Sequence, residues 1–283
     1  MILRPFDPWK SPWCTCPPKL SLNPYTGCPH GCLYCYAASY IPCFQECRPK
    51  PDLHKRLGRE VKKILPGSLI AMSNSSDPYP FLERDLELSR GCLRIMKERG
   101  LRVQVVTKSD LVTRDIDMLS CMKSTVAITL TTLREDLSLR LEPKAPLPGK
   151  RLDAISFLVE RGVPVSARID PIIPGINDLE INYVVRAACQ AGAKHIISST
   201  FKARPLCLGR VCSAFPEEGE NLRILYRSGE RRDGYLLLPA GHRRMLMKEA
   251  QRAAIKEGAT FSCCREGMFF KKAMHCDGSH LIA

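Results

Sequence analysis

The feature that most constrains the fold is a regular alternation of apolar runs and helical stretches across roughly the first two hundred residues. Six runs predict β-strands: Leu20–Leu22, Ser68–Ser73, Arg102–Lys108, Thr125–Thr132, Val163–Pro171 and His195–Thr200. Helical patterns lie between them, over Leu53–Leu65, Glu83–Arg99, Thr113–Met122, Arg151–Arg161 and Leu179–Ala191. This α/β alternation predicts a parallel sheet with helices packed outside it, in either an α/β barrel or a doubly wound sheet.

The alternation ends after Thr200, which predicts a domain boundary near residue 204. Residues 1–204 are expected to form the α/β unit, and residues 205–283 a C-terminal extension that carries a cluster of Cys and His side chains. Within the extension, Gly241–Glu257 has the pattern of one amphipathic helix, and Gly258 follows it as a stop signal.

The chain is basic, with 43 Lys and Arg against 29 Asp and Glu and a net charge of +14. This surplus suits an anionic partner, so nucleic acid is a candidate partner, although a generally basic proteome gives the same surplus. No apolar run approaches the ~18 residues of a membrane span. The first residues also lack the apolar core of a secretory signal. We therefore expect a cytoplasmic protein with no membrane partner.

The chain contains 15 cysteines, which is many for a protein without a signal for secretion. Thiols in a reducing compartment serve metal or redox chemistry more often than disulfides. The informative segment is Asn23–Ser39, "NPYTGCPHGCLYCYAAS", which spaces three cysteines as C-x3-C-x2-C directly after the first predicted strand.

Cys28, Cys32 and Cys35 are the candidate metal ligands of this segment. Three thiolates so close together can hold three corners of an iron–sulfur cluster, and the segment supplies no fourth thiolate. His30 lies within the loop and could complete a tetrahedral zinc site, which is the alternative. The position at the end of a strand favours the cluster, because the chemistry of parallel barrels gathers at strand ends.

The motif resembles that of the radical S-adenosylmethionine (radical SAM) superfamily, whose CxxxCxxC loop binds a [4Fe-4S] cluster through three irons. The resemblance implies that the fourth iron binds S-adenosyl-L-methionine. It also implies a reductive cleavage that yields methionine and a 5′-deoxyadenosyl radical, which abstracts hydrogen from substrate. An electron donor such as ferredoxin or flavodoxin would be needed. Tyr34 corresponds to the family aromatic beside the adenine, and its alternative role is to anchor the loop by packing.

Further segments extend the resemblance to the branch that contains spore photoproduct lyase. They are "SNSSDPYPFLERDLELSR", "VVTKSDLVTRDIDML", "RLEPKAPLPGKRLDAISFLVERG" and "DPIIPGIND", and with the cysteine loop they cover roughly residues 20–200. The fold implied by this resemblance is a partial (β/α)6 TIM-type barrel with a C-terminal extension.

Polar residues follow the second and third predicted strands. Ser75, Ser76 and Asp77 come just past the second strand, where they can accept hydrogen bonds from the ammonium group of the methionine moiety. Lys108 ends the third strand and can meet the methionine carboxylate, although a lysine at a strand end is often a solvated cap. We assign all four residues to cofactor binding.

Two further strands place polar residues two positions apart, which puts each pair on one face. Thr129 and Thr131 are expected in the barrel interior, and by resemblance Thr129 contacts S-adenosyl-L-methionine. Arg168 can reach the cofactor if Asp170 orients it, and the alternative is a structural ion pair between the two. Glu142 and Arg151 are expected in a structural loop that caps the barrel.

The remaining cysteines divide by position. Cys92, Cys121 and Cys189 fall on predicted helix faces and are expected to be buried, whereas Cys14 and Cys16 are spare ligands or packing residues. The tail concentrates soft ligands, and Cys264 and Cys276 form a candidate second site for an iron–sulfur cluster or zinc. Their partners would be His275 and His280, or Cys207 and Cys212. Alternatively, the tail closes the barrel with one thiol near the substrate.

One departure from the family pattern concerns the substrate. Spore photoproduct lyase donates hydrogen from a cysteine just before the second-strand carboxylate, and this chain has Ser73, Asn74, Ser75 and Ser76 there. N–H and O–H bonds are much stronger than S–H bonds, so thymine-dimer repair of that type is not expected.

The substrate is therefore unidentified, with nucleic acid as one candidate. The alternatives are a radical enzyme that modifies a protein or small molecule, and a non-catalytic iron–sulfur or zinc protein that binds nucleic acid. Ser76, Asp77 and Lys108 argue against the last alternative, because a binding module has no need of a methionine pocket.

Overall fold

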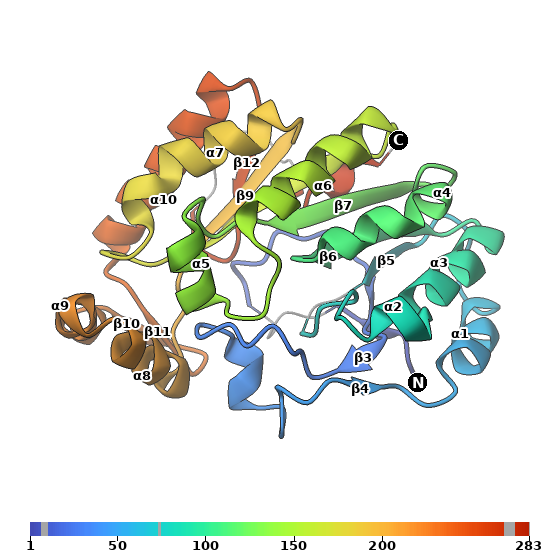
Figure 1. Ribbon diagram of the computed structural model, residues 1–283, viewed down its shortest axis with the longest axis horizontal. Coiled ribbons are helices and arrows are strands. Elements are labelled where there is room, and N and C mark those ends of the chain that lie inside the picture. The colour runs from blue at the N-terminus through green and yellow to red at the C-terminus, as the bar shows by residue number, and fades with distance from the viewer. Residues whose placement is uncertain (7–10, 73–74, 269–274, 283) are drawn as a thin grey trace.

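A computed structural model describes residues 1–6, 11–72, 75–268 and 275–282. Its main element is an eight-stranded sheet in the order β1-β2-β5-β6-β7-β8-β9-β12 (Figure 1). The strands are β1 (Arg4–Pro5), β2 (Leu20–Leu22), β5 (Leu69–Met72), β6 (Arg102–Thr107), β7 (Ser124–Thr129), β8 (Val165–Ile172), β9 (His195–Thr200) and β12 (Thr260–Cys263). All neighbouring strands from β2 to β12 run parallel, and β1 pairs antiparallel with β2.

The predicted parallel sheet is confirmed, and its strand order follows the chain order without reversal. A doubly wound sheet reverses its order at a switch point, so that alternative is wrong. The sheet holds one more parallel strand than the six predicted. β12 pairs with β9 because α10 (Ala240–Lys256) packs against α7 and β9 and returns the chain to the sheet edge. The sheet therefore continues beyond the boundary expected at residue 204.

Helices cover one face of the sheet in Figure 1. They are α1 (Leu53–Val61), α2 (Glu83–Leu86), α3 (Leu88–Glu98), α4 (Ile116–Leu119), α5 (Glu135–Leu141), α6 (Pro148–Glu160), α7 (Ile181–Gln190) and α10, with short 3-10 turns η2 (Asp110–Asp115) and η3 (Asp178–Glu180). The helix expected over Thr113–Met122 splits into η2 and α4, which ends at Leu119. Cys121 lies past that end and is exposed, so its predicted burial is wrong. Cys92 is buried as predicted, and Cys189 is only partly buried.

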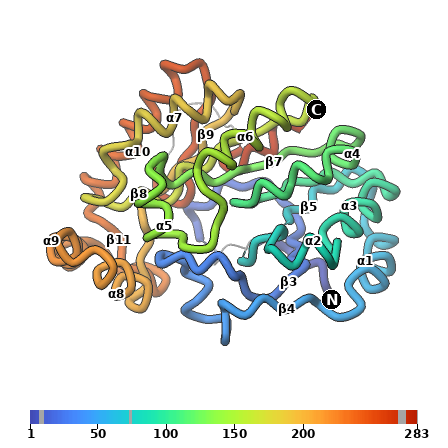
Figure 2. The backbone as a smooth tube through the Cα atoms, in the orientation of Figure 1, coloured from blue at the N-terminus to red at the C-terminus, as the bar shows by residue number. Residues whose placement is uncertain are grey.

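Smaller elements gather at one end of the sheet. They are β3 (Tyr25–Thr26), η1 (Tyr36–Ser39), β4 (Arg48–Pro49), α8 (Pro205–Ala214), α9 (Pro216–Arg227), β10 (Glu230–Arg232) and β11 (Tyr235–Leu237). In Figure 2 the blue segment that contains β3 and β4 runs toward the orange helices α8 and α9. The Cys207 thiol in α8 donates to the Cys35 carbonyl at 3.1 Å, which joins these two parts of the chain.

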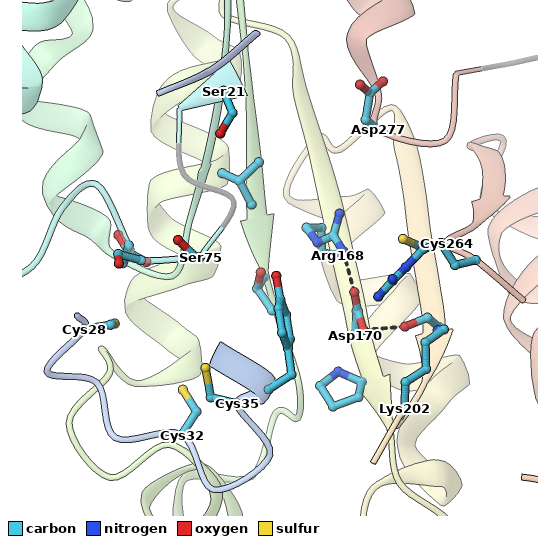
Figure 3. Close-up of a pocket in the computed structure, with 18 of the residues that line it drawn as sticks. Ser21, Cys28, Cys32, Cys35, Ser75, Arg168, Asp170, Lys202, Cys264 and Asp277 are labelled. Atoms are coloured by element: carbon cyan, nitrogen blue, oxygen red, sulfur yellow. Dashed lines mark hydrogen bonds and ion pairs between the residues drawn. The ribbon is translucent and has the colours of Figure 1, made fainter. Parts of the chain in front are cut away.

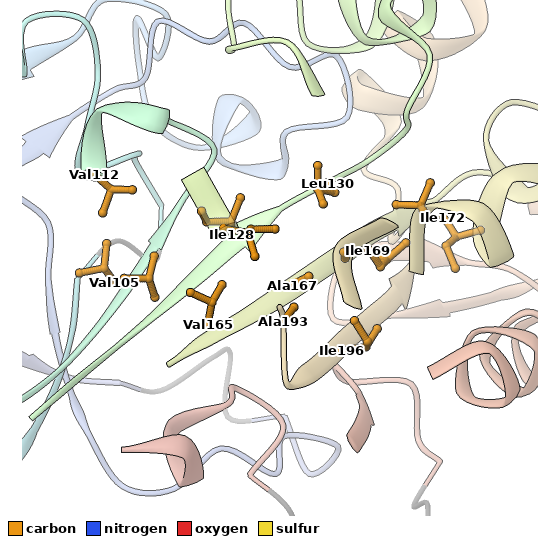
Figure 4. Close-up of a cluster of buried hydrophobic side chains, with 14 of the residues drawn as sticks. Val105, Val112, Ile128, Leu130, Val165, Ala167, Ile169, Ile172, Ala193 and Ile196 are labelled. Atoms are coloured by element: carbon orange, nitrogen blue, oxygen red, sulfur yellow. The ribbon is translucent and has the colours of Figure 1, made fainter. Parts of the chain in front are cut away.

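The hydrophobic core lies between the sheet and its helices. Val105, Ile128, Val165, Ile169 and Ile196 project from four neighbouring strands and are buried there (Figure 4). Side chains alternate across a strand, so the residues between these ones face the opposite side of the sheet. That opposite side carries polar groups and lines the cavity of the molecule.

The described helices include none that is both long and apolar enough to cross a membrane.

We predict that the core carries much of the folding stability. Ile196 is fully buried, so Ile196→Ala should lower the free energy of unfolding by about 2–5 kcal/mol through lost burial and a residual cavity. Leu179 is 86% exposed, and Leu179→Ala should change it by less than about 0.5 kcal/mol. Urea unfolding followed by circular dichroism measures both. Equal effects of the two substitutions would contradict the assignment of this core.

Candidate functional site

A cavity of about 620 Å³ lies on the polar side of the sheet. Its walls come from the cysteine loop after β3, the ends of β5 to β9, the N-terminal segment around residues 14–23 and the C-terminal segment around residues 264–277. Figure 3 shows Cys28, Cys32 and Cys35 on one side of this space and Arg168, Asp170 and Cys264 on the other. The volume is typical of sites for small molecules.

The cysteine loop takes its shape from close backbone packing. Gly27 has a φ of +82°, and a Cβ atom there would lie 2.3 Å from the Glu46 carbonyl oxygen, so no other residue fits. The next residue, Cys28, donates its N–H to the Phe44 carbonyl at 2.7 Å. Cys28, Cys32 and Cys35 all line the cavity, so the structure brings the three predicted ligands to one site.

Burial dominates the electrostatics of these three thiols. It raises the pKa of Cys28 to about 12, with the nearby Asp77 carboxylate as a second cause. Burial also raises the pKa of Cys32 and of Cys35, while Lys108 acts in the opposite direction on both. A metal that binds there must displace protons, because thiolates are the ligating form.

The predicted cofactor residues beyond β5 meet the end of β6. Asp77 accepts hydrogen bonds from the Thr107 hydroxyl at 2.6 Å and from the Lys108 backbone N–H at 2.8 Å. His30 Nδ1 lies 3.6 Å from the same carboxylate. Ser75 and Ser76 also line the cavity, so the structure brings together the residues predicted at these two strand ends.

Lys108 belongs to a buried ionic network. Its Nζ lies 3.8 Å from Glu142 Oε1, and Arg151 Nη2 lies 2.5 Å from Glu142 Oε2. Thr131 donates to Glu142 at 2.6 Å, and the Tyr34 hydroxyl donates to the same carboxylate. Burial alone would raise the pKa of Glu142, but the Arg151 and Lys108 charges and these hydrogen bonds outweigh it and hold the pKa at about 2.

Glu142 and Arg151 were expected in a structural loop that caps the barrel. Glu142 directly follows α5, whereas Arg151 lies in α6 and not in a loop. Glu142 also joins the cysteine loop, Thr131 and Lys108 through direct contacts. The Tyr34 hydroxyl bond supports the anchoring role of that residue, and Tyr34 also lines the cavity.

Of the pairs predicted on the fourth and fifth strands, Thr129, Arg168 and Asp170 line the cavity, whereas Thr131 lies past the end of β7 and is not in the cavity lining. Arg168 forms an ion pair with Asp170, which also accepts from Ser199 at 2.6 Å. Burial lowers the pKa of Arg168 in isolation, but Asp170 outweighs it and raises that pKa. Arg168 therefore forms the ion pair with Asp170 and lines the cavity at the same time. The structure is compatible with both expected roles, a structural ion pair and a contact to the cofactor.

The two cysteines predicted to form a second metal site have other neighbours than expected. Cys264 and Cys276 both line the cavity, but the Cys276 sulfur lies 3.3 Å from that of Cys16. The expected partners are elsewhere: the His280 ring packs against His195, His275 hydrogen-bonds Ser279, Cys207 contacts the Cys35 carbonyl, and Cys212 is buried in α8. The predicted partner set is therefore wrong, because the C-terminal segment meets the N-terminal one.

Single-ion sites do not form from the residues that the structure describes. No three of their His, Cys, Asp or Glu side chains are placed to share one metal ion. His30 lies by Asp77 rather than completing a tetrahedron with the three cysteines, so the arrangement does not support the zinc alternative at the loop.

A second buried polar group, on the wall of the cavity across from the cysteine loop, is not predicted from the sequence. Lys19 forms an ion pair with Asp277 and donates to Gln104 at 3.0 Å, and all three side chains line the cavity. Lys19 precedes a weak, short strand and Asp277 lies in the tail, so no local pattern joins them. Lys202 and Glu266, paired at 2.8 Å, were missed for the same reason.

Comparison with known proteins adds to this geometry. The family model "Radical SAM superfamily" matches residues 22–188. The uncharacterized protein MJ0683 of Methanocaldococcus jannaschii is 34% identical over 187 residues, which are 62% of this chain and 68% of that protein.

Solved structures share the fold. A spore photoproduct lyase mutant with bound AdoMet and dinucleoside spore photoproduct has a TM-score of 0.66 at 14% identity, covering 93% of this chain and 80% of that one. SuiB of Streptococcus suis bound to S-adenosylmethionine has a TM-score of 0.56 at 15% identity, covering 87% and 50%. At these identities the likeness shows the fold alone, and it confirms the predicted partial TIM-type barrel.

We predict that Glu142 contributes stability that acid removes. Its folded pKa of about 2 lies below its ordinary value of 4.5, so this stability is complete above the ordinary value and is lost as the pH falls toward 2. Glu142→Gln should cost about 3–5 kcal/mol at pH 7, because Arg151 and Lys108 then keep unpaired buried charges.

Urea unfolding between pH 7 and pH 2 measures this contribution. The free energy of unfolding should fall less steeply with acid in Glu142→Gln than in the unsubstituted protein. The exposed Glu135→Gln is the matched control and should follow the unsubstituted protein. The same acid dependence in all three proteins would show that Glu142 carries no such contribution.

Proposed function

The chain belongs to the radical S-adenosylmethionine superfamily, and on this premise we propose that Cys28, Cys32 and Cys35 hold a [4Fe-4S] cluster in the cavity. The observation that carries the proposal is that one short loop aims three thiols into a cavity large enough for a cluster and a small molecule. The chain is a radical SAM enzyme, and its substrate is unidentified.

The donor set fits a cluster better than a single ion. The loop offers three soft ligands and no fourth, which leaves one iron of a [4Fe-4S] cluster open. The corners of a cluster lie farther apart than the ligands around one ion. The absence of a single-ion arrangement among the described side chains is compatible with this wider spacing.

The residues beside the loop suit S-adenosyl-L-methionine. Asp77, oriented by Thr107 and the Lys108 N–H, offers a carboxylate to the ammonium group, with Ser75 and Ser76 beside it. The Lys108 ammonium offers a charge to the carboxylate, and Glu142 holds it in place. The Thr129 hydroxyl, the Arg168 guanidinium and the Tyr34 ring complete the proposed cofactor-binding set.

When bound, the cluster and S-adenosyl-L-methionine supply a 5′-deoxyadenosyl radical that abstracts hydrogen from substrate. The chain's own residues position the cysteine loop and the cofactor, and they exclude water from the cavity. Tyr34, Thr131 and Arg151 converge on the buried Glu142, and this network fixes the loop against β7. The buried ion pair of Lys19 and Asp277 closes the far wall of the cavity.

Partners and location belong to the same proposal. The net charge of +14 supports an anionic partner, either nucleic acid as substrate or an acidic electron donor such as ferredoxin or flavodoxin. We place the enzyme in the cytoplasm, where free thiols persist. Ser75 and Ser76 stand where a hydrogen-donating thiol would be needed for thymine-dimer repair, so we do not propose that reaction.

We predict that the loop cysteines are essential for radical formation. Anaerobically reconstituted protein with dithionite and S-adenosyl-L-methionine should release 5′-deoxyadenosine, measured by chromatography. The triple substitution of Cys28, Cys32 and Cys35 by Ala should abolish this release, because these three thiols are the proposed ligands of the cluster that has an open iron for S-adenosyl-L-methionine. Cys121→Ala removes an exposed thiol and should leave it unchanged. Unimpaired release from the triple variant would overturn the proposal.

We also predict that Lys108 binds the cofactor. Lys108→Ala should weaken the binding of S-adenosyl-L-methionine by about 1–3 kcal/mol, the usual contribution of a hydrogen bond to a charged group. Calorimetric titration of reconstituted protein measures the affinity, and the exposed Lys150→Ala is the control. An unchanged affinity with a normal iron content would assign Lys108 a structural role only.

A further inference from the structure

Four cysteines from three parts of the chain line the cavity opposite the cysteine loop. Cys14 and Cys16 lie in the N-terminal segment, Cys264 directly follows β12, and Cys276 lies in the C-terminal segment. Figure 3 shows Cys264 across the space from Cys32 and Cys35. The two sets of thiols thus face one cavity from different sides.

Direct contacts join three of the four side chains. The sulfur atoms of Cys16 and Cys276 are 3.3 Å apart, although the residues are separated by 260 positions in the sequence. The Cys14 thiol hydrogen-bonds that of Cys16, and the Thr15 hydroxyl hydrogen-bonds the Cys276 sulfur. Cys264 is close enough to Cys276 for the two to interact electrostatically.

The surroundings of the four thiols are charged rather than apolar, and they include the Asp170 carboxylate near Cys264 and the Asp277 carboxylate near Cys276. Lys19 and Arg265 act electrostatically on Cys14, and Arg168 and Lys202 act on Cys264. Structural cysteines are usually small hydrophobic residues in a core, as Cys92 is here. Four thiolates on one site need compensating positive charge. These four cations supply part of it, because Lys19, Arg168 and Lys202 are also paired with Asp277, Asp170 and Glu266.

The number of the thiols and the close pair of Cys16 and Cys276 indicate which metal centre they fit. No three of the described side chains are placed around a single ion, so these residues do not form a zinc site. Four cysteines are the usual ligands of a closed iron–sulfur cluster. In a [2Fe-2S] cluster each iron takes two thiolates, so close pairs such as Cys16 and Cys276 are expected.

We propose that Cys14, Cys16, Cys264 and Cys276 bind a second iron–sulfur cluster. It is fully ligated by protein, unlike the cluster at the three-cysteine loop. Both sites face one cavity. A molecule bound between them would therefore lie next to two centres that can each transfer one electron. The site does not depend on the function proposed for the loop, since it shares no ligand with it.

The test starts from the variant in which Cys28, Cys32 and Cys35 are all Ala. This protein, expressed anaerobically with added iron, should keep two or four irons per chain with an equal amount of sulfide, and show the Mössbauer spectrum of a cluster. The further substitutions Cys16→Ala and Cys276→Ala should remove that iron. Cys121→Ala and Cys189→Ala, added to the same background, are the matched controls and should leave it in place.

A second variant guards against a simple loss of folding. Cys264→Ala removes a ligand without disturbing the contact between Cys16 and Cys276, and it should lower the iron content and change the Mössbauer spectrum while circular dichroism stays unchanged. In a chain with an intact three-cysteine loop, Cys16→Ala with Cys276→Ala should lower iron only to the content of one cluster. This result separates a failure of the second site from a failure of the first.

Three outcomes would overturn the proposal. The first is a loop variant that contains no iron, with normal folding. The second is zinc in place of iron and sulfide. The third is a disulfide between Cys16 and Cys276 in protein prepared without oxygen, shown by peptide mass spectrometry without reduction; it would make the two thiols a redox pair instead of ligands.

Discussion

The buried carboxylate of Glu142 is the interaction on which the rest of the site depends. It pairs with the Arg151 guanidinium from α6 and accepts hydrogen bonds from the Thr131 hydroxyl, two residues past β7, and from the Tyr34 hydroxyl of the cysteine loop. Lys108 lies beside it. Breaking a buried network by removing one member leaves the other charges unpaired, which is costly. A single side chain thereby ties the loop that carries the thiols to the sheet that carries the cofactor residues.

The sheet provides the second constraint. Alternation along β7 and β8 directs Ile128 and Ile169 into the core and places Thr129 and Arg168 in the cavity wall. Since successive parallel strands are neighbours, polar residues distant in the sequence form one continuous surface. The same strands therefore stabilise the fold on one face and build the site on the other. A substitution in the core is expected to affect both the stability of the fold and the geometry of the site.

The two ends of the chain complete the cavity. β12 adds Cys264 to the sheet edge, and the segment after it brings Cys276 against Cys16 and Asp277 against Lys19. The predicted extension is therefore a wall of the site and not an appendage. Superfamily membership explains the three-cysteine loop, whereas this second set of thiols is a property of the chain's own termini.

Short-range patterns in the sequence were enough to predict the six strands before residue 204, the α/β class and the three-cysteine loop. Each of these is encoded by neighbouring residues: apolar periodicity sets a strand, and the spacing of Cys28, Cys32 and Cys35 sets a ligand group. Only the tertiary structure decided the partners of Glu142, the addition of β12 and the meeting of Cys16 with Cys276. These contacts join segments as much as 260 residues apart, and no local pattern encodes which segments meet. They depend on how the finished sheet turns both ends of the chain back over its polar face.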